Sequence, residues 1–400
     1  MSPHMSRPSR RPRIGVDFHT FDGIFQGSRS HLLGLYGQAV QLAPHWDFFL
    51  LLDDPQALCR DHPVFDRPNV HPTRMPHAAG PVRLAWQLPL LRRELQLDLL
   101  HLQYRLPWWG EGPYACTIHD VLFESHPQFF SRPFTWLARW SSRDAVRRAR
   151  ALLTVSAYSQ AEMARHYGVA PSRIQVTHNG VDLARFRPDI DPTPLQALGL
   201  TPGGYLCCVG RLEPRKNHVG LVQAYARLPA GQRPPLVIVG QRDFAYAEVF
   251  KLVQQLGLQD EVRFLERVSD AELGAVLAHA RLFVYPSWAE GFGMPVLEAM
   301  ACGVPVVTSR GTALQEVAEG VAWLADPHDP AQLAQVMARA LAEDDAARQA
   351  RIAQGLARAL AFDWASSARV LLQSLAAALP GAMVTPDARA AAASPGRPAG

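Results

Sequence analysis

The chain has 400 residues, of which 48% are hydrophobic and 19% are charged, with a formal net charge of +4. This length exceeds what one hydrophobic core usually serves, so we expect two α/β domains of fewer than about 200 residues each. No apolar run reaches the roughly 18 residues that cross a bilayer, and the basic N-terminus lacks the apolar stretch of a secretory signal. These features argue against a membrane-spanning protein and predict a cytoplasmic location.

The positive charge is concentrated in the first half of the chain. Residues 1–190 contain 22 Arg, no Lys and 16 acidic residues, whereas the remainder has 18 basic and 20 acidic residues. A basic half can meet an anionic partner such as phosphate groups or a membrane surface, and it can equally be a solvated Arg-rich surface. The sequence leaves both interpretations open. Nucleic acid is not an expected partner, because no recognised nucleic-acid motif occurs.

Strands and helices alternate through the first half. We expect a disordered tail over residues 1–13, and after it the predicted strands are 14–18, 46–53, 97–103 and 114–118, with helices at 28–42 and 81–96. Strands that alternate with helices predict a parallel sheet with right-handed crossovers. The first Rossmann-like domain is therefore expected over residues 14–188.

The Pro-rich stretch 188–202 is the expected domain boundary, because the pattern begins afresh beyond it. The predicted strands of the second half are short apolar runs at 205–209, 235–239, 262–265, 282–285 and 304–308. Such runs suit strands buried on both faces, which predicts a second doubly wound domain over residues 200–362. A helix at 363–379 is expected to pack back toward the N-terminal domain. The Ala-, Pro- and Gly-containing tail at 381–400 is expected to be disordered.

The loop 210–217 follows a predicted strand, at the sheet edge where open α/β sheets bind ligands. It carries Arg211 and Lys216 five positions apart, just before a helix. Arg can bind a diphosphate bidentately, Lys supplies a point charge, and Gly210 lets a ligand approach the backbone. The alternative interpretation is an ordinary basic loop on a solvated surface.

Two glutamates eight positions apart, Glu290 and Glu298, enclose a glycine-rich turn that leads into a helix. A carboxylate such as Glu290 can accept from two sugar hydroxyls, and Glu298, about one turn into the helix, can reach a ribose diol. The alternative interpretation is a capped helix, in which the two carboxylates only interact favourably with its positive end. The glycines on either side of Phe292 favour the sugar site over this alternative.

Two loops of the first half also follow predicted strands. His119 and Asp120 come directly after the strand at 114–118, and a His there can donate to a phosphate or sugar oxygen, although a lone His is more often structural. Gly27 and Arg29 belong to a glycine-containing loop whose N–H groups can face phosphates. Its spacing is not G-x-G-x-x-G, which argues against an ordinary dinucleotide site.

Arg211 and Lys216, together with the E-x7-E segment from Glu290 to Glu298, resemble the retaining glycosyltransferases of family 4. The likeness extends through residues 302–307, 311–316 and 178–182 and covers most of residues 14–375, more strongly in the second domain than in the first. The family has the GT-B architecture, in which two Rossmann-like domains face a deep cleft. The resemblance therefore implies donor binding in the C-terminal domain and acceptor binding in the N-terminal domain.

The resemblance also implies a role for each matched residue. Arg211 and Lys216 would hold the donor diphosphate, Glu298 the ribose, and Glu290 the hydroxyls of the transferred sugar. His119 joins Arg211, Lys216 and Glu290 as a catalytic residue, whereas Asp120 is expected to be structural. The other matched substrate-binding positions are Phe292, Gly293 and Met294 at the sugar and Val268 at the base. Gly27 is expected near the phosphates from its place in the loop after the first strand. Glycine is common where Glu266 stands, and the loop at 22–29 departs from the compact glycine loop of the family.

The resemblance implies transfer of a mannose- or glucose-type hexose, with retention, from a nucleotide-sugar such as GDP-mannose or UDP-glucose. The acceptor is expected to be a saccharide or lipid-linked saccharide in polysaccharide biosynthesis. No D-x-D motif is placed to hold a divalent ion, and the resemblance implies a metal-independent reaction without a cofactor. No carboxylate can be nominated as a nucleophile, which favours a front-face route. The alternatives are an epimerase-like enzyme and a non-catalytic nucleotide-sugar-binding protein.

The segment 129–150 intersperses aromatic residues with arginines. They are Phe130, Phe134, Trp136 and Trp140 among Arg132, Arg139, Arg143, Arg147 and Arg148. A basic aromatic helix can lie on anionic lipid, which would suit a lipid-linked acceptor and a peripheral position at the inner face of the membrane. We favour the alternative, in which the aromatic stripe packs on the sheet, because burial there needs no further partner.

Overall fold

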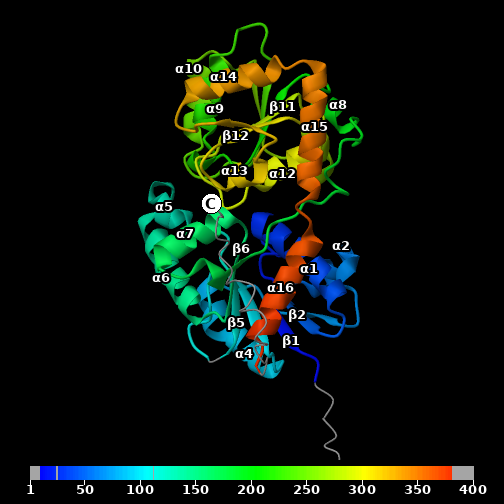
Figure 1. The fold of residues 1–400 in the computed structure, drawn as a ribbon, viewed down its shortest axis with the longest axis vertical. Helices are drawn as coiled ribbons and strands as arrows, with labels where there is room; N and C mark the ends of the chain where they lie inside the picture. Colours follow the sequence, from blue (N-terminus) through cyan, green and yellow to red (C-terminus); the bar gives the residue numbers. More distant parts are fainter. Residues whose placement is uncertain (1–9, 24–25, 111, 381–400) are drawn as a thin grey trace, which may run out of the picture.

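The computed structural model describes residues 10–23, 26–110 and 112–380. Two parallel β-sheets with flanking helices form two domains, the N-terminal one below the C-terminal one in Figure 1. The predicted α/β class with two Rossmann-like domains is confirmed. The predicted tails at 1–9 and 381–400 lie outside the described residues. Residues 10–13 do not continue such a tail, because Arg10 donates to Asp98 at 2.7 Å and the first strand begins at Arg13.

The first sheet has its strands in the order β3-β2-β1-β4-β5-β6-β7, all parallel. They are β1 (Arg13–Asp17), β2 (Asp47–Leu52), β3 (Val70–Arg74), β4 (Leu99–Gln103), β5 (Tyr114–Thr117), β6 (Ala151–Thr154) and β7 (Ile174–Val176). The direction of winding changes between β1 and β4, the point at which sheets of this kind bind ligands beyond their carboxyl ends.

Helices cover both faces of this sheet. They are α1 (Gln26–Leu42), α2 (Pro55–Asp61), α3 (Gly80–Val82), α4 (Leu88–Glu94), α5 (Leu122–Ser125), α6 (Arg132–Arg148) and α7 (Ala157–Tyr167), with a short 3-10 turn η3 at Pro127–Phe129. Strand β2 shows why both faces are covered. Phe48 and Leu50 belong to one core cluster, while Phe49 and Leu51 belong to the other. A strand that is apolar at every position needs a layer on each side.

The second sheet is also parallel, in the order β10-β9-β8-β11-β12-β13. Its strands are β8 (Leu206–Val209), β9 (Leu236–Val239), β10 (Val262–Leu265), β11 (Leu282–Tyr285), β12 (Val306–Ser309) and β13 (Trp323–Ala325). The helices that follow the first domain are α8 (Pro194–Ala197), α9 (His218–Ala226), α10 (Ala247–Gln255), α11 (Asp270–Ala278), α12 (Met294–Ala301), α13 (Ala313–Ala318), α14 (Pro330–Leu341), α15 (Asp345–Leu360) and α16 (Trp364–Ala378).

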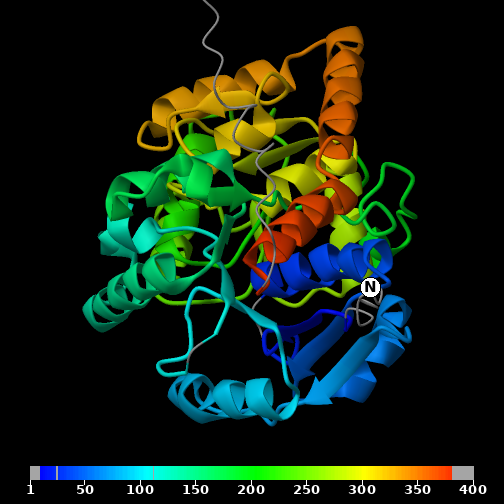
Figure 2. The same ribbon diagram turned by 60° about the horizontal axis from the view of Figure 1, so that its bottom comes forward.

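Helix α16 crosses from the second domain to the first and lies beside α1, as both ribbon views show (Figures 1 and 2). Its Leu371 and Leu375 are fully buried in the core cluster that contains α1. The indole of Trp364 sits so close to Gly34 and Gly180 that a Cβ at either position would overlap it. The C-terminal helix is thus a structural part of the N-terminal domain.

The structure also differs from the predicted elements. Strands β3, β6, β7 and β13 were not predicted. Strands β7 and β13 are only three residues long and β3 contains Pro72, whereas β6 is as long and as apolar as the strands that were predicted. The single helix predicted at 81–96 is divided into α3, a π-helical turn at Arg83–Gln87 and α4. Pro89 removes an N–H donor within that stretch, which accounts for part of the irregularity.

Candidate active site

The carboxyl end of β11 leads into a buried charge cluster centred on Glu290, which is only 8% exposed. Its Oε1 atom accepts hydrogen bonds from Lys216 Nζ at 2.6 Å, Ser287 Oγ at 2.7 Å and Tyr285 Oη at 3.0 Å. Its Oε2 atom pairs with Arg215 Nη1 at 2.8 Å. A carboxylate offers about four acceptor positions. Among the described residues, three donors share Oε1 whereas only Arg215 meets Oε2, so Oε2 retains an acceptor position that a sugar hydroxyl can use.

Arg215 belongs to this cluster, although the sequence directed attention to its neighbours. Its guanidinium also donates to Glu213 Oε1 at 2.7 Å and to the carbonyl of Ala289 at 2.9 Å. Burial opposes the charged form, but Glu290 and Glu213 outweigh it and raise the pKa of Arg215. The one sequence signal for this residue was its place beside Lys216 in the same post-strand loop.

The charges of this cluster keep Glu290 ionised. Burial by itself would raise the pKa of Glu290, but Arg215 and Lys216 together with the hydrogen bonds from Lys216 and Ser287 lower it to about 2. Burial and the charge of Arg215 in turn lower the pKa of Lys216. With four donors around it, this carboxylate is only weakly basic.

Arg211 and Lys216 lie at opposite ends of the segment between β8 and α9. Lys216 faces β11, where Nζ also donates to Tyr285 Oη at 2.7 Å. Arg211 pairs with Asp243, beyond the end of β9, at 3.0 Å. The structure therefore places the two cations in separate ion pairs. A diphosphate held by both would have to lie between these pairs.

Helix α12 begins at Met294, directly after the glycine-rich turn. Gly293 occupies the N-cap position with φ of +102°, and a Cβ there would overlap Leu314, so glycine is required. Phe292 beside it is buried. The turn thus presents backbone rather than side chains at the helix start, as expected for a ligand that approaches closely.

Glu298 lies one turn into α12 and contrasts with Glu290. It is partly buried, and within the described ranges its carboxylate has no hydrogen bond or ion pair. Burial raises the pKa of Glu298 to about 7, with Arg185 acting in the opposite direction. A partly buried carboxyl without a protein partner is available to a ligand hydroxyl.

The stretch 266–268 follows β10, and the resemblance assigned it to the nucleotide base. Its side chains lie in different environments. Glu266 forms an ion pair with Arg242 at 2.6 Å, so its carboxylate is already engaged. Val268 is partly buried against the core of the C-terminal domain. Its backbone lies just before Ser269, which caps α11.

His119 lies in a group of buried histidines at the carboxyl ends of β4 and β5. Its ring is 4.6 Å from that of His31 on α1, between centroids, and it stacks on Tyr104. Burial, followed by the neighbouring His31 and His101, lowers the pKa of His119 well below its ordinary value. The imidazole is therefore neutral at physiological pH, with one nitrogen as donor and the other as acceptor.

Two buried polar atoms near His119 lack partners in the described part of the chain. His119 Nε2 lies 3.1 Å from Gln103 Oε1, but the Nε2 atom of Gln103 has no hydrogen bond. His31 bonds Asn179 through Nδ1 at 2.8 Å, and its Nε2 atom is also without a partner. Leaving such groups unpaired costs free energy unless a ligand or water satisfies them. Sequence analysis missed both; the position of Gln103 at the end of β4 was the available signal.

The loop after β1 leaves open space around Gly27. Gly27 lies in the first turn of α1, is exposed, and has no atom within 4 Å of the position a Cβ would take. Arg29 lies over the ring of Phe21 at 4.7 Å. Nothing in the described surroundings of Gly27 requires a glycine.

The two domains meet around Gly291. Its carbonyl accepts hydrogen bonds from Ser156 Oγ at 2.7 Å and Ser159 Oγ at 3.2 Å, and a Cβ on Gly291 would crowd Asp120. Asp120 also accepts from the N–H of Leu122, which agrees with a structural role. The loop that carries His119 therefore faces the Glu290 segment.

A second polar contact joins the domains through Glu316 of α13. Its carboxylate accepts from the N–H groups of Ala157 and Tyr158, both at 2.9 Å, at the start of α7. It also lies 2.9 Å from His178 Nε2. The two sheets are thereby held with the loops at their carboxyl ends facing each other.

The aromatic face of α6 corrects the favoured interpretation of that helix. Trp136 is 70% exposed, and Trp140 and Phe134 are also exposed. The face that packs on the domain consists of small residues instead. These are Thr135, Ala138, Ser141, Ser142, Ala145 and Val146. Because small side chains fill the contact with the sheet, the two tryptophans point outward.

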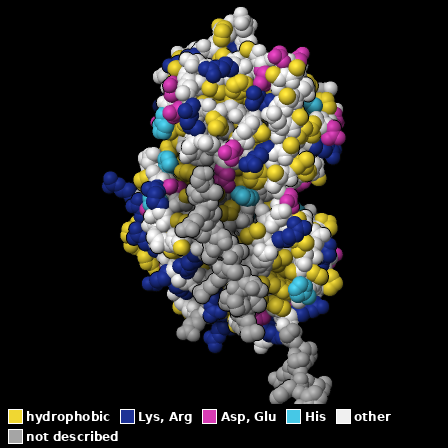
Figure 3. All heavy atoms as spheres, viewed as in Figure 1, with side chains coloured by type: hydrophobic (Ala, Val, Ile, Leu, Met, Phe, Trp, Pro, Cys, Tyr) yellow, Lys and Arg dark blue, Asp and Glu magenta, His cyan; other side chains and the backbone are white. Residues whose placement is uncertain are grey.

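No helix among the described residues is long and apolar enough to cross a membrane. Basic side chains are frequent on the N-terminal domain, the lower half of the space-filling view in Figure 3. On α6, Arg132, Arg143 and Arg147 are exposed beside the two tryptophans. The positions 132, 136, 140, 143 and 147 follow helical spacing, so they form one stripe.

Two facing Rossmann-like sheets, with a basic loop and a paired-glutamate segment at the edge of the second, define the GT-B class of glycosyltransferases. Residues 198–355 match the family described as glycosyl transferases group 1, and residues 38–185 match glycosyltransferase family 4. The chain belongs to glycosyltransferase family 4.

Known proteins agree with this assignment. An O-antigen chain mannosyltransferase B of Escherichia coli is 36% identical over 57% of this chain and 61% of its own length. The match thus spans less than two thirds of that relative. Sucrose-phosphate synthase from Thermosynechococcus elongatus has a TM-score of 0.69 at 22% identity, covering 91% of this chain and 98% of its own. Anabaena Alr3699/HepE in complex with UDP and glucose has a TM-score of 0.67 at 22% identity, covering 91% and 99%.

The raised pKa of Glu298 predicts a pH dependence of stability. The carboxyl has a pKa of about 7 when folded and an ordinary value of 4.5, so between these values the folded state holds a proton that the unfolded state has released. The free energy of unfolding therefore falls as the pH rises through this window, by about 3 kcal/mol in total. Glu298→Gln should flatten this fall in urea unfolding measured across the window.

The matched control is Glu319→Gln, which removes an exposed carboxylate of the same domain. It should keep the wild-type pH profile. An unchanged profile in Glu298→Gln would show that this carboxyl does not hold a proton in the folded protein.

Proposed function

We propose that the chain transfers a mannose- or glucose-type hexose, with retention, from a nucleotide-sugar to a saccharide or lipid-linked saccharide acceptor in polysaccharide biosynthesis. The observation that carries the proposal is the Glu290 cluster at the end of β11, with unpaired Glu298 beyond it and His119 across the domain contact. The mannosyltransferase named among the relatives supports mannose as the transferred sugar, for which we propose GDP-mannose as donor. The neighbour that holds UDP and glucose supports UDP-glucose as the other candidate.

Departure of the nucleoside diphosphate requires stabilisation of developing negative charge. In the proposed reaction Arg211 and Lys216 supply cations, and the N–H groups at the start of α12 supply a helix end. Lys216 is already buried beside Glu290, so its position is fixed before the substrate arrives. Arg211, in a partly exposed pair with Asp243, exchanges that partner for a phosphate oxygen. The proposed reaction needs neither a metal ion nor a cofactor.

The role that we propose for Glu290 is to orient these groups while the transferred sugar lies against the turn formed by Phe292, Gly293 and Met294. Glu298 accepts from the ribose, and the backbone at Val268 faces the base. In the route that we propose, the acceptor attacks on the face from which the diphosphate leaves, and the departing phosphate takes its proton.

On the acceptor side, the proposal uses His119 and the polar atoms around it. The unpaired Gln103 Nε2 and His31 Nε2 atoms would be satisfied by sugar hydroxyls. Neutral His119 can then donate to or accept from a hydroxyl without adding charge to the cleft. Gly27 lies at the start of α1, where the donor phosphates would approach the N-terminal domain.

A cytoplasmic, membrane-peripheral position at the inner face of the membrane is part of the same proposal. The exposed stripe of tryptophans and arginines on α6 combines apolar rings with positive charge, the combination that binds anionic lipid surfaces. The exposed Trp108 and Trp109 lie near its C-terminal end, because Arg148 of α6 donates to the carbonyl of Pro107 at 2.9 Å. A lipid-linked acceptor would then be presented beside the acceptor domain.

Substituting the cations of the β8–α9 segment tests the catalytic part of the proposal. Lys216→Ala and Arg211→Ala should each lower turnover with GDP-mannose or UDP-glucose by about two to three orders of magnitude, because each removes a charge that stabilises the leaving diphosphate. Arg339→Ala, an exposed cation on α14 of the same domain, serves as the control and should behave as wild type. Near-normal turnover in both variants would refute the assignment.

Product analysis on donor alone and on donor plus acceptor separates the three candidate functions. A transferase gives a longer saccharide only when acceptor is present. An altered sugar from donor alone would instead identify an epimerase-like enzyme. Donor binding without any turnover would identify a nucleotide-sugar-binding protein.

The membrane part of the proposal predicts lipid binding through α6. The chain should co-sediment at low salt with vesicles that contain anionic lipid, and the double variant Trp136→Ser/Trp140→Ser should reduce the bound fraction about fivefold or more. Leu360→Ser, which changes an exposed apolar residue on α15, is the matched control. If the wild-type chain stays in the supernatant at low salt, the membrane proposal is wrong.

A further inference from the structure

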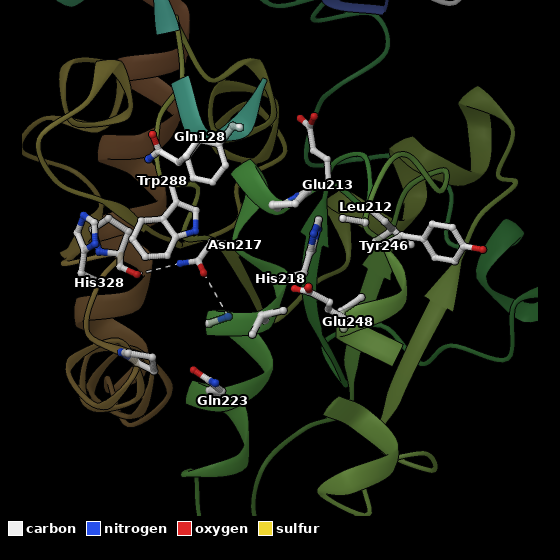
Figure 4. A pocket seen from close by; sticks show the side chains of 18 residues that line it. Gln128, Leu212, Glu213, Asn217, His218, Gln223, Tyr246, Glu248, Trp288 and His328 are labelled. Atoms are coloured by element: carbon white, nitrogen blue, oxygen red, sulfur yellow. Dashed lines mark hydrogen bonds between the residues drawn. The ribbon is translucent and has the colours of Figure 1, made fainter. Parts of the chain in front are cut away.

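A cavity of about 530 Å³ lies where the N-terminal domain meets the α9 side of the C-terminal domain. Its walls come from five segments that are far apart in sequence, including η3, the start of α9, the start of α10 and the loops after β11 and β13. In Figure 4, Trp288 and His328 lie on one side and Leu212 and Tyr246 on the other, with His218 between them. The volume is within the range of about 300–1,000 Å³ that holds small ligands.

This cavity is separate from the residues matched to the donor. Glu298, Val268, Phe292 and Met294 are not among the residues that line it. It is nevertheless adjacent to the Glu290 cluster through a shared wall. Trp288 lines the cavity, and its backbone N–H donates to the carbonyl of Arg215 at 2.9 Å. The side chain of Arg215 in turn pairs with Glu290.

Both domains are needed to close the cavity. Phe129 of η3 lies 6.3 Å from Trp288, between ring centroids, and Gln128 lines the cavity beside it. The η3 turn is only a few residues beyond His119 and Asp120 along the chain. The cavity is therefore close to the acceptor side of the cleft as well as to the loop that holds Arg215.

The chemistry of the lining indicates a neutral, hydroxyl-rich ligand. The rings of Phe129 and Trp288 provide apolar surfaces, and the exposed carboxylate of Glu248 provides a hydrogen-bond acceptor. Tyr246 forms part of the opposite wall, with its ring directed away from Trp288 (Figure 4). Among the described residues that line the cavity, none is Lys or Arg, so a phosphate or nucleotide would meet the carboxylate of Glu248 without a lining cation.

A buried polar atom in the lining is left without a partner. His218 is 4% exposed, and its Nε2 atom has no hydrogen bond in the described part of the chain. Asn217 beside it is different, because its amide donates to the carbonyls of Pro286 and Pro327 and accepts from the N–H of Gly220. The helix start is thus satisfied by the protein, whereas the His218 nitrogen is buried without a partner and has almost no surface exposed to the cavity.

We propose that this cavity binds a neutral hexosyl unit of the acceptor saccharide, at a distance from the hydroxyl that receives the transferred sugar. The inference rests on the proposed transferase function and deepens it, since it assigns to the acceptor a chain of sugars rather than a single one. The rings of Phe129 and Trp288 pack against the sugar ring, while Glu248 accepts hydrogen bonds from its hydroxyls. An acceptor bound in this way gains affinity from a part that does not react, which raises kcat/KM for longer acceptors.

The experiment compares methyl α-mannoside with α-linked mannotriose as acceptors, using whichever of GDP-mannose and UDP-glucose supports transfer. The wild-type chain should show kcat/KM about tenfold higher for the trisaccharide. Tyr246→Ala and Glu248→Gln should each remove most of this preference and leave the value for methyl α-mannoside unchanged. Glu248 is exposed, so its variant remains informative even if the Tyr246 variant is unstable.

The matched control is Phe244→Ala. Phe244 belongs to the same loop and is exposed, but it does not line the cavity, so its variant should keep the wild-type preference. Mannotriose binding, measured by saturation-transfer NMR without donor, provides a second readout. The signal should be present for the wild-type chain and for Phe244→Ala, and reduced for the Tyr246 and Glu248 variants.

The possible results separate this inference from the proposed function. Transfer with equal kcat/KM for both acceptors, or variants that keep the wild-type preference, would overturn the inference and leave the transferase function standing. Mannotriose binding that depends on Tyr246 and Glu248, without transfer from either donor, would support the cavity and refute the function. Neither binding nor transfer would overturn both.

Discussion

The buried ion cluster around Glu290 is the interaction on which the rest of the site depends. Two cations and two hydroxyls meet one carboxylate in an environment where an unpaired charge would be costly. The cluster ties the β8–α9 segment to the loop after β11, because Arg215 and Lys216 come from the former and Glu290 from the latter. Each loop is therefore fixed by the other, before any substrate binds.

Several features follow from this fixed position. The next residue, Gly291, meets Ser156 and Ser159 of the first domain, so the cluster also sets the place where the domains touch. Beyond it, Gly293 directs the chain into α12 and places Glu298 one turn away. Trp288, whose backbone N–H donates to the carbonyl of Arg215, forms a wall of the cavity. Donor residues, domain contact and cavity thus share one support.

The two glutamates illustrate how environment separates roles within one segment. Glu290 is surrounded by donors, and its pKa is lowered to about 2. Glu298 is partly buried, its carboxylate has no hydrogen bond or ion pair in the part of the chain that the structure describes, and its pKa is raised to about 7. The first is a structural anchor for cations, while the second is the group that a ligand can satisfy. Spacing in the sequence treats them alike, and only the packing around them distinguishes their chemistry.

The sequence predicted the two-domain class because short apolar runs that alternate with helical segments, and the Pro-rich stretch between the two halves, can be recognised locally. It did not predict β3, β6, β7 or β13, whose stability comes from their neighbours in the sheet rather than from their own composition. The same limit applies to the site. Lys216 and Glu290 were found from their motifs, whereas the contacts of Arg215, Gln103 and His31 depend on residues distant in sequence. For α6, helical periodicity identified the aromatic stripe but not which side of the helix faced the sheet.

The central claim is that a nucleotide-sugar binds between the basic β8–α9 segment and α12. A crystal structure with GDP, and a second with UDP, tests it most directly. The account predicts the diphosphate between Arg211 and Lys216 and the ribose hydroxyls at Glu298 for the nucleotide that binds. Density for the nucleotide in the cavity beside Trp288, or a ribose away from Glu298 with Arg211 still paired to Asp243, would contradict it.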